Sequence, residues 1–368
     1  MASFISQITV RHQVFFHRKG SKEQRDKENK PVSGFDPLSL CSFVMKTVIY
    51  FSLSMKLAQT MTGKILAASL SAAFLLMQGC GSTSLESASH RWVSSSGDDA
   101  NPCSHSAPCK TFAQAFTQTP AGGEIGVLDS GSFGELSITK PVTINGQGAT
   151  ISVAPNVNGF VVNAGANDVV SIKNLSLTGT GSAANGIRYI AGNQLTVEGV
   201  TITGFSGNGV EVELGKGGQA AGGGKLIVTN SSIGNCGKSG FKMSAASGFA
   251  TATLENVQLN SSTNGVEIGG GNTFTLINRS SITSHTGSGI LAAAASAVIN
   301  ADNSIIAFNG VGVNASAAAT TIRLSGNGIY HNGEGLKLLA GATVTSDGTN
   351  RIEGNASTQT PNGIVKRQ

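Results

Sequence analysis

Charged and aromatic residues are scarce in this chain. Only 12% of its 368 residues are charged and 5% are aromatic, whereas glycine alone accounts for 49 residues. Alanine, serine, threonine and asparagine are abundant, and valine and isoleucine recur in short runs. This combination of turn formers with β-branched residues is typical of β structure with many turns.

Most of the chain has no large excess of charge of one sign. The formal net charge is +5, but residues 1–79 hold 10 Lys or Arg and 4 Asp or Glu, whereas residues 80–368 hold 15 and 16. Because this second part is nearly neutral, it lacks the basic footprint of a nucleic-acid-binding protein. We therefore expect no nucleic acid partner.

The basic excess belongs to a targeting region. Lys56 and Lys64 precede the apolar run ILAASLSAAFLLM (65–77), which is followed by QGCGSTS. A charged start, an apolar run too short to span a membrane comfortably and a small-residue zone predict an export signal over residues 55–80.

The segment LLMQGC resembles the lipobox of bacterial lipoproteins, with Cys80 as the lipidated residue. The match is imperfect, because Leu76 lies four rather than three residues before the cysteine and Gln78 replaces the usual small residue. Plain cleavage and an uncleaved anchor are the alternatives. In lipoproteins of this kind, the absence of aspartate after the cysteine implies the outer membrane.

The expected location is therefore the outer membrane or cell envelope, with a periplasmic or secreted protein as the alternative. Residues 1–54 contain a polar charge run without apolar periodicity, HRKGSKEQRDKENK, which predicts a disordered or untranslated extension. Residues 81–90 are interpreted as a linker.

Cys103 and Cys109 lie in NPCSHSAPCK, each after a proline, in a chain predicted to enter an oxidising compartment. This context predicts a disulfide between them. A metal site that includes His105 is the alternative, but the spacing and the lack of a second Cys/His pair argue against it. The remaining Cys236 is expected in a turn or in the core.

From about residue 140 the sequence repeats a first motif, in which glycine precedes an apolar residue, at steps of 23 to 31 residues. A second motif, which often begins with asparagine, recurs at nearly the same steps. The spacing of both motifs increases at one insertion, GKGGQAAGGGK (215–225). The anchor glycines are Gly159, Gly186, Gly209, Gly240, Gly265, Gly289, Gly312, Gly335 and Gly363.

Each unit of about 23 residues also contains a third short apolar alternation, such as FTL at 274–276. The unit therefore consists of three short strands separated by turns. It lacks the apolar spacing of helical solenoids and the leucine-dense consensus of leucine-rich repeats.

Such a unit cannot bury its apolar side alone, so we expect the units to coil right-handedly and to stack with like strands about 4.8 Å apart. The predicted fold class is all-β: a right-handed single-stranded parallel β-helix of about eight to ten coils, with repeats over 140–368.

Stacking decides which side chains face inward. The residue after each anchor glycine is apolar and is expected to line one interior column, as in Ile187, Val210, Phe241 and Val266. Asparagines are expected at stacked turn positions, where their amides bond each other and the left-handed conformation is tolerated. These are Asn309, Asn332 and Asn355, and His285 falls in the same column. We interpret His285 as a turn residue rather than a catalytic base.

The stretch TFAQAF (111–116), after Pro108, predicts a short amphipathic helix that caps the core within a cap and first coil at 91–139. The longer run RWVSSSGDDANPCSHSAPCKTFAQAFTQTPAGGEIGVLDSGSF…ITKPVTINGQGATI resembles the opening of right-handed parallel β-helix proteins of the pectin-lyase-like superfamily. The likeness lies in a V…G-D strand and turn, a P-x-x-T-F helix start and a G-x-I-x-V…G strand. With the repeats, it covers residues 91–364. It implies the fold but little about activity, because many members have no assigned reaction.

Two glutamates in the repeats, Glu211 and Glu213, stand two positions apart. On a strand such residues share a face at about 6.5–7 Å, in or near the spacing of carboxylate pairs in sugar-cleaving enzymes. In the repeat register Glu211 stacks between Arg188 and Lys242, and Glu267 follows. This order predicts a ladder of alternating charges. Glu213 has no charged counterpart in the same register of the neighbouring coils.

The superfamily resemblance implies a second interpretation of these charges. Its polysaccharide lyases and hydrolases bind sugar chains along an outward strand face, which would make Arg188, Glu211, Glu213, Lys242 and Glu267 ligand-binding residues. A lyase of the pectate type needs acidic calcium ligands and a basic proton acceptor, for which Glu211, Glu213 and Lys242 are the catalytic candidates. The grouped aspartates, GHG and RIK-like segment of the polygalacturonase type are absent from the sequence.

Asp98 and Asp99 in SGDDANPC are interpreted as turn formers before a proline, with calcium binding near the cap as the alternative. No other cofactor or metal is expected.

The sequence thus favours a protein without a catalytic signature: an exported cell-envelope β-helix module that binds carbohydrate or another cell-surface component. A polysaccharide lyase acting on acidic glycans is the alternative. The expected partner is a polysaccharide or surface component, and membrane contact is expected through the lipid anchor only.

Overall fold

The computed structural model describes residues 89–215 and 223–365. The chain divides into two units, Met1–Ser82 and Thr83–Gln368, and the described residues belong to the second. The predicted export signal, including Cys80, lies outside the described residues. Among the residues that are described, no helix has the length and hydropathy needed to cross a membrane.

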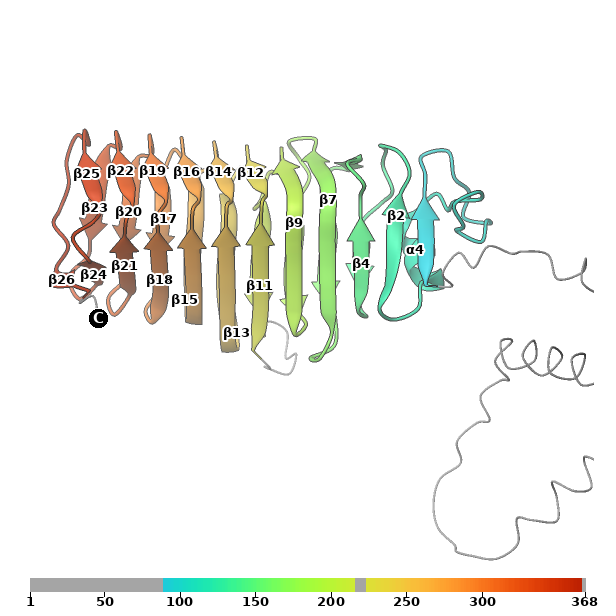
Figure 1. The fold of residues 1–368 in the computed structure, drawn as a ribbon, viewed down its shortest axis with the longest axis horizontal. Coiled ribbons are helices and arrows are strands. Elements are labelled where there is room, and N and C mark those ends of the chain that lie inside the picture. Colours follow the sequence, from blue (N-terminus) through green and yellow to red (C-terminus); the bar gives the residue numbers. More distant parts are fainter. Residues whose placement is uncertain (1–88, 216–222, 366–368) are drawn as a thin grey trace, which may run out of the picture. The chain divides into compact units, whose positions relative to one another are not determined.

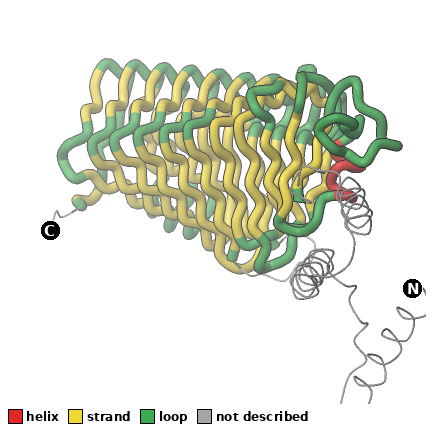
Figure 2. Tube along the Cα trace, turned by 45° about the vertical axis from the view of Figure 1, so that its right-hand side comes forward, coloured by secondary structure: helices red, strands yellow, loops and turns green. Residues whose placement is uncertain are grey.

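The repeats form a right-handed coil of parallel strands with three faces (Figures 1 and 2). The first face contains the strands that follow the anchor glycines. Its strands are β3 (Leu136–Ile138), β6 (Phe160–Asn163), β8 (Ile187–Ala191), β10 (Val210–Leu214), the first parts of β13 (Ser239–Glu255) and β15 (Asn264–Asn278), β17 (Ser288–Ala292), β20 (Val311–Ala315) and β23 (Glu334–Leu338).

The second face follows the first along each coil. It contains β1 (His90–Val93), β2 (Gly123–Val127), β4 (Val142–Asn145), the first parts of β7 (Val169–Gly179) and β9 (Gln194–Thr203), β11 (Gly224–Thr229), the last parts of β13 and β15, β18 (Ala297–Asp302), β21 (Thr321–Ser325), β24 (Thr343–Ser346) and β26 (Gly363–Ile364).

The third face contains the second repeated motif, which often begins with asparagine, and it completes the coil. It contains β5 (Thr150–Val153), the last parts of β7 and β9, β12 (Ser232–Gly234), β14 (Gln258–Asn260), β16 (Ser281–Thr283), β19 (Ile305–Ala307), β22 (Gly328–Tyr330) and β25 (Arg351–Glu353). The expected three strands per unit are thereby confirmed.

The predicted interior column exists. Ile187 pairs with Val210, Val210 with Phe241, and Phe241 with Val266. All four side chains are fully buried. The column extends through Ile290, Val313 and Leu336. Burial of each such side chain contributes about 1.5–3 kcal/mol, so this column is one large contribution to the stability of the apolar shaft.

Two corners of each coil turn through a residue in the left-handed conformation. Between the second and third faces these residues are Asn174, Gly199, Asn230, Asn256, Arg279, Asn303 and Gly326. Between the third and first faces they are Gly204, Asn235, Ser261, Ser284, Phe308, His331 and Gly354. Most are glycine, asparagine or serine, which suits the small penalty that glycine and asparagine incur in this conformation.

The asparagine stack at the second of these corners corrects one expectation. The amide of Asn309 donates to Asn332 Oδ1 at 3.0 Å, and the amide of Asn332 donates to Asn355 Oδ1 at 2.9 Å, as predicted. The left-handed residue, however, is the one before each asparagine. The asparagine itself turns its side chain inward, where the amide also bonds a carbonyl of the preceding coil.

His285 lies in this stack, as expected of a turn residue. Its ring is buried, Ser262 N donates to Nδ1 at 3.2 Å, and its own backbone N–H donates to Asn309 Oδ1 at 3.0 Å. Nε2 is buried and has no hydrogen-bond partner among the described residues. Burial lowers the pKa of His285 below its ordinary value.

We expect this histidine to make stability depend on pH. Because its folded-state pKa lies below that of the unfolded chain, its stabilising effect is present above about pH 6.5 and is lost as the pH falls. His285→Asn, the residue of the next coils, should remove this loss and add about 1 kcal/mol by relieving the unpaired nitrogen. Urea unfolding at neutral and acidic pH measures both effects, with the exposed His105→Asn as control. An unchanged pH dependence in His285→Asn would refute the interpretation.

The N-terminal cap contains the predicted helix. Helix α4 (Phe112–Gln118) begins after Thr111, whose side chain accepts a hydrogen bond from Gln114 N as an N-cap should. Phe112 and Ala115 are buried, and the Phe112 ring packs against Phe133 and Phe160 at centroid distances of 5.3 and 5.5 Å. The helix therefore closes the apolar shaft at its first coils.

One anchor glycine of the repeat was predicted wrongly. Gly363 is not an anchor glycine of the first face, because β26 pairs with β24 on the second face and Ile364 is 82% exposed. The FTL segment is a strand, as predicted, in which Thr273 and Thr275 face inward and Phe274 and Leu276 face outward. Thr273 stacks between Ala250 and Ala297, so small side chains line the interior at this position.

Candidate functional site

The five predicted site residues come together on the outward side of the first face. Glu211 on β10 pairs in register with Arg188 on β8 and with Lys242 on β13, and Lys242 pairs with Glu267 on β15. Glu213 shares the outward side of β10 with Glu211. We call these five side chains the charged row.

The ion pairs in the charged row differ from a simple ladder. Lys242 Nζ lies 2.9 Å from Glu267 Oε1, as the ladder predicts. Arg188, however, binds Glu213 more closely than Glu211: its Nε lies 2.9 Å from Glu213 Oε2 and 3.7 Å from Glu211 Oε2. The long guanidinium side chain reaches the diagonal neighbour on the next strand. Glu213 thus has a charged partner that column register alone did not reveal.

Amides and a hydroxyl hold the carboxylates in place. Glu211 accepts hydrogen bonds from the side-chain amides of Asn185 and Asn208, at 3.1 and 3.0 Å. Glu267 accepts from Ser239 Oγ at 2.6 Å and from the Asn264 amide at 3.3 Å. Burial alone would raise the pKa of Glu267, but the bonds from Ser239 and Lys242 outweigh it and lower the pKa.

Sequence reasoning missed these supporting residues. They stand directly before anchor glycines and form a chain of their own, in which Asn208 N donates to Asn185 Oδ1 and Ser239 N donates to Asn208 Oδ1. The recurring dipeptide NG at the start of first-face strands is the signal that could have found them.

The side chains of the charged row are partly buried. The side chains of Glu211, Glu213 and Glu267 are only 14, 15 and 18% exposed, and those of Arg188 and Lys242 are 31% exposed. Both ends of the row sit on strands of a continuous parallel sheet. Strand pairing therefore sets the positions of these donors and acceptors on the face.

The acidic and basic groups of the charged row are paired with one another. Arg188 bonds Glu213 and approaches Glu211, and Lys242 bonds Glu267. A side chain that acts as a general acid or base must reach the substrate, and each of these would first have to leave its present partner.

The same side chains do not fit a calcium site. Their carboxylate oxygens already accept bonds from Arg188, Lys242 and amides. Within 89–215 and 223–365 there is no group of three or more His, Cys, Asp and Glu placed to hold a metal.

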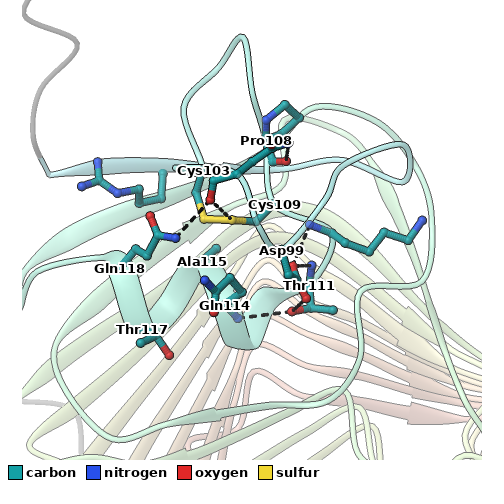
Figure 3. The surroundings of a disulfide bond; sticks show 12 residues. Asp99, Cys103, Pro108, Cys109, Thr111, Gln114, Ala115, Thr117 and Gln118 are labelled. Atoms are coloured by element: carbon teal, nitrogen blue, oxygen red, sulfur yellow. Dashed lines mark hydrogen bonds between the residues drawn. A yellow bond between two sulfur atoms is a disulfide. The ribbon is translucent and has the colours of Figure 1, made fainter.

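The predicted disulfide is present at the cap. Cys103 and Cys109 are joined, with Cα atoms 4.6 Å apart, and both residues are buried (Figure 3). The metal alternative at these cysteines was therefore wrong, and His105 packs edge-on against Trp92 instead. The remaining Cys236 is buried, and burial raises the pKa of its thiol to about 11.

Asp98 and Asp99 brace the cap loop. Asp98 Oδ1 accepts a hydrogen bond from Ala100 N at 2.9 Å. The Asp99 carboxylate accepts from Lys110 N, Thr111 N and Thr111 Oγ1, each at 2.9 Å (Figure 3). These bonds are those of turn-forming residues and fix the start of helix α4.

Comparisons with known proteins agree with this architecture. Residues 219–365 match a family model described as right handed beta helix region. No curated protein matches the sequence. The crystal structure of pectate lyase Pel9A is similar at 15% identity, with a TM-score of 0.54, over 75% of this chain and 78% of that one.

Two further solved structures are similar at lower TM-scores. They are the A-module of the Azotobacter vinelandii mannuronan C-5 epimerase AlgE4 (14% identity, 67% of this chain, 91% of that chain, TM-score 0.41) and a rhamnogalacturonan lyase (11% identity, 74% of this chain, 87% of that chain, TM-score 0.41). The chain is a right-handed parallel β-helix repeat protein with a pectin-lyase-like fold.

Proposed function

We propose that the protein is an exported cell-envelope module that binds polysaccharide along the charged row, without cleaving it. The observation that carries the proposal is the saturation of the row: its carboxylates are engaged by Arg188, Lys242 and neighbouring amides, so they are fixed for recognition rather than poised for proton transfer. The likeness in fold to a pectate lyase, and the export signal predicted at 55–80, support a polysaccharide outside the cytoplasm as the ligand.

The alternative is a polysaccharide lyase acting on acidic glycans. The observation that favours it is that two basic groups, on Arg188 and Lys242, stand on the same outward face as three carboxylates. Beta-elimination leaves an unsaturated product that absorbs ultraviolet light, so turnover and binding can be measured on the same glycans.

Lys242→Gln and Glu213→Gln are expected to weaken polysaccharide binding by about tenfold, which corresponds to about 1.4 kcal/mol. The matched control is Lys337→Gln. Lys337 follows in the same outward column four coils later, but it is 55% exposed and forms its ion pair within its own strand, with Glu334. Isothermal titration against polygalacturonate, alginate and neutral glycans measures the effect.

An ultraviolet product assay on the same panel decides between the two functions. Turnover that is abolished in Glu213→Gln would overturn the binding proposal in favour of the lyase. If Lys242→Gln and Glu213→Gln bound polysaccharide with the same affinity as the control Lys337→Gln, the charged row would not be the binding surface.

A further inference from the structure

The third face changes character near its end. On the earlier strands β9, β12, β14 and β16 its outward side chains are small or polar. On β19, β22 and the corner that follows each of them, large apolar or aromatic side chains face outward. We call this surface the aromatic platform; it consists of Ile305, Phe308, Tyr330 and His331.

Phe308 is the most unusual member of the platform. Its backbone is left-handed, with φ of 59°, at a corner where the preceding coils carry glycine, asparagine and serine. A bulky side chain is a genuine outlier in this conformation. Burial in the core does not account for its presence, because Phe308 is 62% exposed. Strain that burial does not offset points to a role of the side chain at the surface.

The rings of the platform are fixed by their neighbours. Phe308 stacks on His331 with centroids 5.4 Å apart and an interplanar angle of 18°. The His331 ring in turn occupies the space beside Gly354, where a Cβ would approach Cε1 within 2.8 Å. The Tyr330 ring covers Gly328, where a Cβ would lie 2.3 Å from Cε2 and 2.9 Å from Oη. Two glycines therefore leave room for aromatic rings against the strands.

The surroundings of the platform are polar. In register with Tyr330 on the next strand is Glu353, and in register with Gly328 is Arg351; both side chains are exposed. Ile305, which is 52% exposed, borders Gly328 on the other side. A small apolar centre is thus edged by one acidic and one basic group.

The size of the platform indicates its partner. A stable protein interface buries about 800 Å² on each side, whereas a buried aromatic side chain supplies about 150–250 Å². Two partly covered rings, an imidazole and one isoleucine fall short of that area. They match the face of a sugar ring, whose axial C–H bonds pack against the negative face of an aromatic ring while its hydroxyls reach charged groups at the rim.

We propose that the aromatic platform is a second carbohydrate-binding site, which takes pyranose rings with equatorial hydroxyls in a β-linked chain. Rings of this kind present only C–H bonds on their faces and hydroxyls at their edges. Tyr330 and the face of Phe308 that is turned away from His331 supply stacking surfaces, and Arg351 and Glu353 bond hydroxyls. This site lies on the third face. It goes beyond the function proposed for the charged row, and neither proposal depends on the other.

The test is titration of the full chain with cellohexaose and chitohexaose. Phe308→Ser introduces the residue found one coil earlier, Ser284, and Tyr330→Thr introduces the residue found two coils earlier, Thr283. Each substitution is expected to weaken binding at least about tenfold. Phe308→Ser should also raise the urea midpoint, because it relieves the strained backbone.

Matched controls show whether binding depends on the platform itself. Phe249→Ser removes another exposed phenyl ring, on β13, and should leave affinity unchanged. Mannohexaose, whose axial 2-hydroxyl interrupts one ring face, should bind more weakly than cellohexaose. Lys242→Gln should not affect cellohexaose binding, which separates this site from the charged row. Absence of cellohexaose and chitohexaose binding by the intact protein, or equal affinity in Phe308→Ser, would overturn the proposal.

Discussion

Phe241→Ala is expected to lower the free energy of unfolding by about 3–5 kcal/mol. Phe241 is fully buried and stacks between Val210 and Val266 in the interior column. Truncation removes the burial of the ring and leaves a cavity between two valines on strands held in place by their ladders, so the site cannot collapse. Urea unfolding followed by circular dichroism measures the loss.

The matched control for this substitution is Phe249→Ala. Phe249 is 52% exposed on the same strand, β13, so its truncation should change stability by no more than about 0.5 kcal/mol. Similar losses for the two variants would contradict the placement of Phe241 in a continuous shaft.

Asn332→Ala is expected to cost about 3 kcal/mol, because it breaks the asparagine stack at its centre. Asn332 Oδ1 accepts from the backbone N–H and the amide of Asn309, at 2.9 and 3.0 Å. Its amide donates to Ile306 O at 3.0 Å. All of these groups are buried, so truncation leaves a backbone N–H and a carbonyl without these partners. Urea unfolding measures this loss as well.

Asn303→Gly provides the comparison. Asn303 lies exposed at a left-handed corner, and Gly326 occupies the same position one coil later. This change should alter the urea midpoint little, because glycine adopts the conformation freely. A loss as large as that in Asn332→Ala would show that the exposed amide of Asn303, which donates to Asn278 Oδ1, stabilises the coil as much as the inward stack does.

The fold was predictable because its stabilising interactions repeat. Each coil places an apolar residue after an anchor glycine, so the register of Ile187, Val210, Phe241 and Val266 follows from spacing alone. His285 could be identified as a turn residue for the same reason. Helix α4 and the disulfide followed from local signals, a helix start after proline and two Pro-Cys pairs.

Interactions that depend on more than the repeat spacing were not predictable. The pairing of Arg188 with Glu213 depends on the reach of one side chain across to a diagonal neighbour, which spacing does not encode. The inward Thr273 depends on the alanines above and below it. The aromatic platform arises where single coils depart from the repeat, at Phe308 and Tyr330. Because these residues do not recur from coil to coil, the repeat pattern does not predict them.

The equal length of the late coils has a consequence for evolution by duplication. From Ile290 to Val313 and from Val313 to Leu336 the chain advances by one coil each time, with strands that pair with the coils directly before and after. Insertion or loss of a whole coil between β15 and β19 would therefore preserve the shaft while moving the aromatic platform relative to the charged row in increments of about 4.8 Å. The distance along the coil axis between the two surfaces can therefore change only by whole coils, while the side chains of each surface stay as they are.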